Sequence, residues 1–253
     1  LYLYYKMNIV NCSFTGGGGR LCNQIIRNIA ASIICKRHNK KINYFMHTEI
    51  EKLGITLYTS MYEPQYKSTI KLKNETYFQA LNNDVISNID FTSDFFQEEN
   101  ITDLIYTYLN TDEQKENIIK MNPFNTRYNN NNDLFIHIRL GDVSHFNPGI
   151  EYYIECIKSM KYNQIYIASD SPNHTIIKEL QQLYPNINII NYDEIKSIQF
   201  GSTCSNIILS HGSFSAIIGY LSYFTKNIYY PNENRRNGWC PMGLFTNKGW
   251  LGR

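Results

Sequence analysis

The 253-residue chain lacks an apolar run long enough to cross a membrane. Polar or charged side chains interrupt its two most apolar stretches, residues 25–35 and 204–224. Neither stretch reaches the roughly 18 apolar residues that a spanning helix needs. The first residues also lack the basic segment, apolar segment and small-residue cleavage site of a signal peptide. We therefore expect no membrane span in this chain.

The sequence also lacks an excess of charged residues of one sign. Lys and Arg together number 24 and Asp and Glu number 22, which leaves a formal net charge of +2. Because a general nucleic-acid binder needs a strongly basic face, this balance argues against nucleic acid as a partner.

Metal and redox motifs are absent as well. The six cysteines are widely spread with no C-x2-C pair, so we interpret them as small buried side chains in a reducing compartment. Together with the missing signal peptide, this favours a cytoplasmic location. The sequence has no Asp-x-Asp pair suited to a divalent ion, and we expect no metal site.

The second half of the chain alternates short β-branched or aromatic runs with helix-length segments. The predicted strands cover residues 134–139, 165–169, 187–190, 207–210 and 227–230. The predicted helices between them cover residues 151–160, 173–184, 193–200 and 213–224. This alternation is typical of an α/β fold with a parallel, doubly wound sheet.

The first half begins in the same way. We predict a strand at 7–14, a glycine run at 16–19 and a helix at 21–38, then a strand at 41–45 and, later, a helix at 112–120. The four asparagines at 129–132 are the most polar point before the second alternation, and we interpret them as a linker. The predicted domains are therefore residues 1–128 and 133–253.

The glycine run is the first candidate site. Glycines between a strand and a helix let a ligand approach the backbone, and the free N–H groups of the helix start favour an anion. No Lys-Ser/Thr follows, so this is not a P-loop. Leu21 stands where a dinucleotide fingerprint needs its third glycine, and no acidic residue follows about 20 positions later. A flexible turn without a ligand is the equal alternative.

The second candidate site is residues 137–142, His-Ile-Arg-Leu-Gly-Asp, at the carboxyl end of a predicted strand. Ligands of open α/β sheets bind at that edge. Strand alternation places His137 and Arg139 on the same side. An arginine on a buried strand is costly unless an anion or a carboxylate pairs with it. The alternatives are a ligand site and an internal Arg139–Asp142 ion pair.

Two further strand ends carry polar groups. In residues 210–215, hydroxyls and amides at a helix start form an anion site, or else Ser213 caps the helix. In residues 168–171, Asp170 accepts from a base or ribose, or caps the helix at 173. We also expect Ser171-Pro172 to begin that helix.

Together these segments resemble the α1,2-fucosyltransferases of glycosyltransferase family 11, relatives of the α1,6- and protein O-fucosyltransferases. Residues 137–142 resemble the H-x-R-x-G-D motif of that family, and residues 18–24 resemble its G-G-L-G-N-Q motif, with Arg20 inserted and Cys22 in place of a glycine. Residues 167–170 resemble its strand ending in Ser-Asp, and residues 213–215 resemble its S-S-F-S. The order and spacing agree over residues 7–47 and 134–250.

This resemblance implies a GT-B-like pair of Rossmann-type domains and an inverting, metal-independent transfer of L-fucose from GDP-fucose to a glycan hydroxyl, of the galactoside α1,2 type. The acceptor-side domain would be the first and the donor-binding domain the second. No cofactor is implied beyond the donor substrate. The donor-binding residues that the resemblance implies are Gly18, Gly19, Gln24, His137, Arg139, Asp170, Ser213, Phe214 and Ser215, with Arg139 on the diphosphate.

The catalytic residues follow from the chemistry and the resemblance together. Departure of GDP leaves negative charge on the β-phosphate, and the fixed guanidinium of Arg139 can stabilise it. Asp142 and His145 lie close to Arg139 in sequence and are candidates for the base that deprotonates the acceptor. Asn23 would border the reaction centre.

Three other functions remain as alternatives. A transferase on the same scaffold can use another sugar nucleotide, and an inactive module can bind nucleotide or glycan without transfer. A nicotinamide-dependent oxidoreductase is disfavoured by the missing third glycine and acidic partner.

Overall fold

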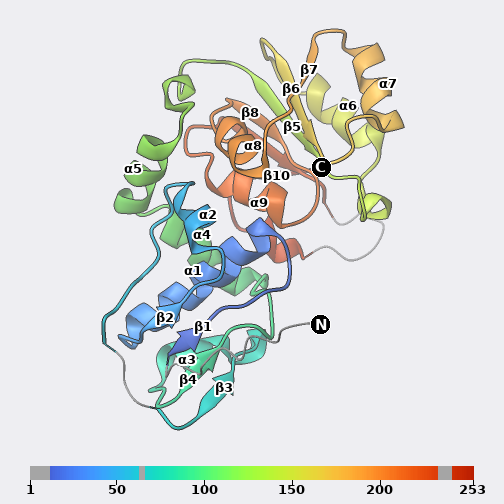
Figure 1. The fold of residues 1–253 in the computed structure, drawn as a ribbon. Helices are drawn as coiled ribbons and strands as arrows, with labels where there is room; N and C mark the ends of the chain where they lie inside the picture. Colours follow the sequence, from blue (N-terminus) through green and yellow to red (C-terminus); the bar gives the residue numbers. More distant parts are fainter. Residues whose placement is uncertain (1–11, 63–65, 233–240) are drawn as a thin grey trace, which may run out of the picture. The chain divides into compact units, whose positions relative to one another are not determined.

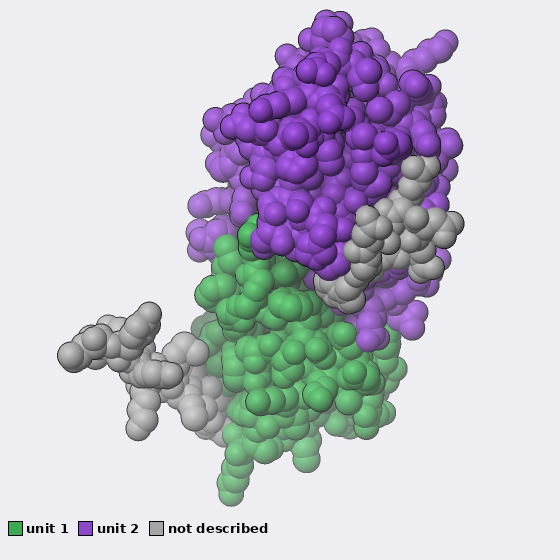
Figure 2. Space-filling view, turned by 90° about the vertical axis from the view of Figure 1, so that its right-hand side faces the viewer, with its two compact units in different colours: residues 1–47, 57–96 green, residues 48–56, 97–253 purple. Residues whose placement is uncertain are grey.

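The computed structural model describes residues 12–62, 66–232 and 241–253. The contacts of the chain divide it into two compact units, which Figure 2 colours separately. The first unit is Leu1–His47 with Leu57–Phe96, and the second is Thr48–Thr56 with Gln97–Arg253. Both units contain helices and a sheet.

The described part of the first unit is built on four parallel strands in the order β2-β1-β4-β3. These strands are β1 (Ser13–Phe14), β2 (Ile42–Asn43), β3 (Thr69–Lys71) and β4 (Asn88–Asp90). The helices are α1 (Leu21–Arg37), α2 (His47–Glu51), which crosses into the second unit, η1 (Asn74–Thr76) and α3 (Tyr77–Asn82). Most of α1 is buried, which explains its long apolar sequence.

The second unit holds six parallel strands in the order β10-β9-β8-β5-β6-β7 (Figure 1). Its strands are β5 (Leu134–Ile138), β6 (Ile165–Ser169), β7 (Ile187–Ile189), β8 (Asn206–Ile208), β9 (Asn227–Tyr230) and β10 (Leu251–Gly252). Counted from β5, the spatial order is 3-2-1-4-5-6, which is that of a Rossmann-type fold. The strand order therefore reverses between β5 and β8.

The helices of the second unit complete the double winding. They are α4 (Glu99–Leu109), α5 (Asp112–Met121), α6 (Ile150–Lys158), α7 (Thr175–Leu183), α8 (Glu194–Gly201) and α9 (Ser213–Tyr220), with short η2 (Asn125–Arg127), η3 (Ser144–Phe146) and η5 (Met242–Leu244). Helix α6 packs against α7, and α8 packs against α9. Because the crossovers on the two sides of β5 run in opposite directions, right-handed connections place these two pairs on opposite faces.

The predicted fold class is confirmed: the chain is α/β with two parallel sheets, the second of Rossmann order. Each of the five strands predicted in the second half exists within two residues of its predicted bounds. The described part of the predicted strand 7–14 is Ser13–Phe14, and residues 7–11 lie outside the described residues. Strand β10 and the elements between residues 48 and 111 were not predicted.

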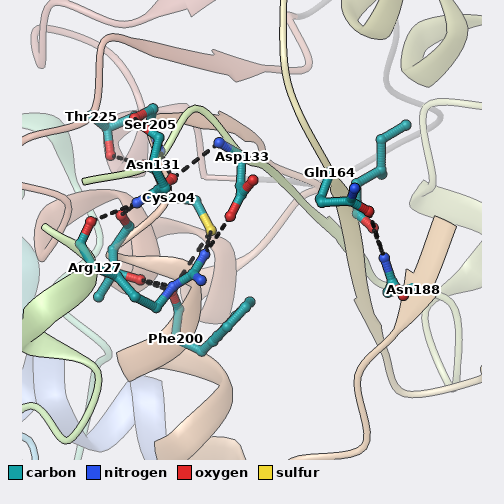
Figure 3. Close-up of polar contacts among 11 residues, drawn as sticks. Arg127, Asn131, Asp133, Gln164, Asn188, Phe200, Cys204, Ser205 and Thr225 are labelled. Carbon is teal, nitrogen blue, oxygen red and sulfur yellow. Dashed lines mark hydrogen bonds and ion pairs between the residues drawn. The ribbon is translucent and has the colours of Figure 1, made fainter. Parts of the chain in front are cut away.

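The asparagine run predicted as a linker is an ordered turn inside the second unit. The Asn131 side chain donates to the carbonyl oxygens of Arg127 (2.6 Å) and Thr203 (3.0 Å) and accepts from the amides of Asp133 and Ser205 (Figure 3). These bonds connect the segment that precedes β5 with the segment that precedes β8. The division by contacts falls after residues 47, 56 and 96.

Two predicted helix starts differ from the structure. His174, not Ser171-Pro172, caps α7, because its Nδ1 accepts from the amide of Ile176 at 3.3 Å. Gly212 precedes α9 with φ of 87°, so Ser213 is the first helical residue and not its cap.

Two other expectations concern side chains and hydropathy. The five cysteines within the described residues are buried, as predicted, and Cys240 lies outside those residues. Within the same residues, no helix is both long and apolar enough to span a membrane.

Candidate functional site

Arg139 lies directly after β5, at the carboxyl edge of the second sheet. Its guanidinium forms ion pairs with both Asp142 and Asp170. The Arg139 side chain is 16% exposed, whereas Asp142 is 61% exposed and Asp170 is 25% exposed. The ion pair that the sequence offered as an alternative is therefore present, with a second carboxylate added.

Asp170 organises the turn after β5. Its Oδ1 accepts from the backbone amides of Leu140 (2.8 Å) and Gly141 (3.2 Å), while its Oδ2 accepts from Arg139. A Cβ atom at Gly141 would lie 2.5 Å from Oδ2 of Asp170, so a larger residue would have to displace that carboxylate. Asp170 thus holds Arg139 and its turn, and does not cap the following helix.

The register brings three chemically active residues into one row. Strands β5 and β6 pair Ile138 with Ser169, so the next residues in register are Arg139 and Asp170. Strands β5 and β8 pair Ile136 with Ile208, and counting three residues further sets Arg139 beside His211. The row crosses the point where strand order reverses, which is where open α/β sheets bind ligands.

His137 and Ser215 bond to each other below this row. His137 Nδ1 and Ser215 Oγ are 2.6 Å apart, and the same hydroxyl accepts from the Ser210 amide at 3.0 Å. Ser215 is fully buried, and the His137 ring packs against Phe214 with centroids 4.8 Å apart. Burial lowers the pKa of His137 to about 3, so the imidazole is neutral.

The other residues predicted in this unit flank the row. Ser213 and Phe214 form the first turn of α9, where backbone N–H groups lack partners within the helix. His145 lies exposed in η3, its ring 3.9 Å from that of Phe146. The structure thus brings Arg139, Asp142 and Asp170 into direct contact, and joins His137 to Ser215.

The glycine-rich loop of the first unit is held by side chains of α1. Gly18 and Gly19 have φ of 106° and 79°, which glycine adopts readily. Gln24 is fully buried and donates to the Gly18 carbonyl oxygen. A Cβ atom on Gly19 would lie 2.6 Å from Nδ2 of Asn23, so the predicted residues Gly18, Gly19, Asn23 and Gln24 form one cluster.

Arg27 completes that cluster, and the sequence did not assign it a role. Its guanidinium donates to the carbonyl oxygens of Gly16 (2.8 Å), Gly18 (3.2 Å) and Asp94 (3.1 Å). The ring of Phe95 lies 4.8 Å from the guanidinium carbon. Burial lowers the Arg27 pKa, and Asp90 and Asp94 oppose that shift. The sequence signal that could have identified Arg27 is its position as a lone arginine in the apolar stretch of α1.

His211 is the second residue for which no role was predicted. It is 5% exposed, and its Nε2 is buried without a hydrogen-bond partner. Burial and the charge of Arg139 lower the pKa of His211 to about 4. As for metals, the described residues include no group of three or more His, Cys, Asp or Glu side chains able to hold an ion.

The comparisons with known proteins give a shared fold. No protein-family model matches the chain, and no curated protein matches it in sequence. Fucosyltransferase NodZ from Bradyrhizobium superposes with a TM-score of 0.52 at 9% identity, over 86% of this chain and 94% of that chain. A variant of Arabidopsis thaliana FUT1 in complex with GDP also gives 0.52, at 10% identity, over 90% of this chain and 73% of that chain.

A further structure, NodZ α1,6-fucosyltransferase soaked with GDP-fucose, gives a TM-score of 0.42 at 12% identity. That alignment covers 65% of this chain and 60% of that chain.

Proposed function

We propose that the protein is an inverting glycosyltransferase that moves L-fucose from GDP-fucose to a hydroxyl of a glycan. The observation that carries the proposal is the position of Arg139, beside the reversal point of a sheet with Rossmann strand order. The fold it shares with NodZ and with GDP-bound FUT1 supports this donor.

In this proposal Arg139 binds the diphosphate. A guanidinium offers two parallel N–H donors to phosphate oxygens, and the first turn of α9, with Ser213 and Phe214, adds backbone donors. Asp170 orients Arg139 through the contacts described above. His137 and Ser215 support this arrangement from within the unit, since their polar atoms bond to each other.

At the anomeric carbon, the reaction makes one bond and breaks one. The acceptor oxygen attacks the anomeric carbon, the bond from that carbon to the phosphate oxygen breaks, and its electron pair stays on GDP. Configuration inverts, and the acceptor proton passes to a base. Asp142 and His145 are the candidates for that base. Asp142 would have to leave Arg139, and its 61% exposure permits that.

The remaining assignments rest on the motif resemblance. Gly18, Gly19, Asn23 and Gln24 border the reaction centre in this proposal, and Arg27 fixes their loop. The H-x-R-x-G-D pattern at residues 137–142 supports an acceptor of the galactose type and an α1,2 linkage. Arg139 and the donors at α9 take the role that a metal ion has in other transferases, so the proposed reaction needs no metal.

The test is a titration of the protein with GDP, UDP and ADP, followed by assays of GDP-fucose hydrolysis and of transfer to galactosides. We expect GDP to bind most tightly and transfer to occur. Tighter binding of UDP or ADP would identify another sugar nucleotide as donor. GDP binding without transfer or hydrolysis would identify an inactive binding module.

A further inference from the structure

The unpartnered Nε2 of His211 is one of three buried side-chain polar atoms without a partner in the described part of the chain. A buried N–H group without an acceptor costs about 1–3 kcal/mol, so such a group calls for an explanation. His211 lies three residues after the end of β8, level with Arg139 when the register is continued, and precedes Gly212, whose positive φ turns the chain into α9. The atom therefore lies at the reversal point of the sheet.

A chain of hydrogen bonds fixes which nitrogen of His211 carries its proton. Oδ1 of Asn147 accepts from the Gly149 amide at 3.1 Å, so Nδ2 of Asn147 faces the Tyr153 hydroxyl at 2.9 Å and donates to it. Tyr153 then donates to Ser210 Oγ at 3.3 Å. With its oxygen accepting from Tyr153, Ser210 donates its one hydroxyl proton to His211 Nδ1, 3.3 Å from Oγ.

His211 Nδ1 is consequently an acceptor, and Nε2 carries the hydrogen. The ring is neutral, because burial and the nearby charge of Arg139 disfavour the imidazolium. The titratable groups that act on it are Arg139, Asp170 and His145. A neutral N–H beside a guanidinium suits an anionic oxygen, which Arg139 attracts and which the N–H can bond.

The same chain of bonds links His211 to Arg139 through the backbone. Asn147 Nδ2 also donates to the Arg139 carbonyl oxygen at 3.0 Å. One amide side chain thus holds the turn that carries the guanidinium and sets the tautomer of the imidazole. Both donors are prepared before a ligand arrives, which is how electrostatic stabilisation avoids reorganisation.

We propose that His211 is a donor-binding residue whose Nε2–H bonds a phosphoryl oxygen of the diphosphate held by Arg139. The identity of the nucleotide in this inference rests on the proposed function. The binding of an anionic oxygen rests only on the local geometry. Nε2 is shielded from solvent, so the phosphate must displace a neighbour to reach it; the Phe146 ring stands edge-on to the imidazole, with centroids 6.1 Å apart.

Two substitutions test the proposal. His211→Asn removes the distal N–H, and His211→Gln restores an N–H at a similar reach. Affinities for GDP and for inorganic pyrophosphate are measured by calorimetry on samples whose thermal midpoints are also recorded. We expect both ligands to bind about 10- to 100-fold more weakly to His211→Asn, as for loss of a charge-assisted hydrogen bond. His211→Gln should recover most of that loss, and guanosine affinity should not change.

A measurement on the unaltered protein covers the case in which a variant does not fold. With 15N-labelled histidine, saturation with pyrophosphate should shift the Nε2–H resonance of His211. An unchanged resonance, parent-like affinity of His211→Asn or a lack of recovery in His211→Gln would overturn the proposal. If the parent binds pyrophosphate with this dependence but not GDP, the proposed donor is wrong and His211 keeps its role. Parent protein that binds neither ligand contradicts both.

Discussion

Arg139 is paired with two carboxylates. The contribution of these ion pairs to stability decides whether its charge serves the fold or ligand binding. Asp142 is mostly exposed, and Asp170 is a quarter exposed. An ion pair with an exposed partner, such as Asp142, typically contributes about 0–1 kcal/mol to stability, and Asp170 keeps its bonds to the amides of Leu140 and Gly141 when Arg139 is removed. A phosphate in the same position gains two charge-assisted hydrogen bonds in a transition state that gathers charge on it. The geometry therefore favours a role in binding over a role in stability.

The corresponding prediction is that Arg139→Ala loses transfer while the fold survives. We expect the rate to fall by about 10² to 10³, as when an oxyanion donor is removed, and the free energy of unfolding to change by about 1 kcal/mol or less. Arg139→Lys should recover little, because lysine keeps the charge but not the planar fork. GDP affinity and thermal midpoint are measured on the same sample. A destabilised Arg139→Ala that binds GDP like the parent would show that the ion pairs are the purpose of Arg139.

At the scale of elements, the loop between β1 and α1 offers neighbouring glycines with different demands. Gly18 has φ of 106°, whereas Gly17 is not among the residues with positive φ, and a Cβ atom at either one would meet nothing within 4 Å. Backbone strain is therefore the only cost that separates them.

We predict that Gly18→Val impairs transfer and destabilises the protein, whereas Gly17→Ala behaves like the parent. A residue with a Cβ at positive φ costs about 1–2 kcal/mol, and more when β-branched. Gly18→Ala gives the intermediate case. The measurements are transfer rate and thermal midpoint for all three. Normal transfer by a folded Gly18→Val would show that this loop only connects β1 to α1 and has no role in transfer.

The sequence predicted those elements whose pattern is local. Buried strands such as Ile165–Ser169 and the helix at Leu21–Arg37 have enough apolar residues to define a period. Strand β3 has three residues, all exposed, so it carries no period at all. Helix α4 was missed although Ile101, Ile105 and Leu109 recur at helical spacing and are buried.

The site divides in the same way. Strand ends identified Arg139 and Asp170, because polar groups after buried strands are visible in sequence. Their mutual contact depends on the β5–β6 register, which no local pattern specifies. The asparagine run misled for a related reason: Asn131 is polar because it bonds Thr203 and Ser205, more than 70 positions away. His211 was visible within its motif, but its unpartnered nitrogen was not.

At the scale of the whole molecule, two buried neutral histidines should make stability depend on pH. The folded-state pKa is about 3 for His137 and about 4 for His211, against about 6.5 in the unfolded chain. The unfolded chain therefore binds more protons between these values. Stability is full above pH 6.5 and falls as the pH drops towards 4, by about 1.4 kcal/mol per pH unit for each histidine.

Denaturant titrations at pH 7 and pH 5 measure this slope. His137→Gln should lose roughly half of the pH dependence, because one of the two buried imidazoles is gone. His145→Gln is the matched control, since His145 is exposed and its replacement keeps both buried rings. Equal slopes in the parent and in His137→Gln would mean that His137 accepts a proton in the folded protein.

The last prediction concerns how the molecule as a whole stabilises the charge of the departing GDP in the proposed reaction. Transferases that use Mg²⁺ hold it with one or two carboxylates and the phosphates of the substrate. The sequence has no Asp-x-Asp pair suited to that ion, and residues 12–62, 66–232 and 241–253 assemble no group of three ligand side chains. The second unit supplies instead a fixed guanidinium, the amides at the start of α9 and the N–H of His211. We therefore expect transfer to survive EDTA at the parent rate. Added Mn²⁺ should not restore Arg139→Ala, because the ion does not replace the two parallel N–H donors of the lost guanidinium. Loss of transfer in EDTA with recovery in Mg²⁺ or Mn²⁺ would replace the arginine mechanism with a metal-dependent one. Unchanged transfer by Arg139→Ala in EDTA would exclude the arginine mechanism and the metal-dependent mechanism alike.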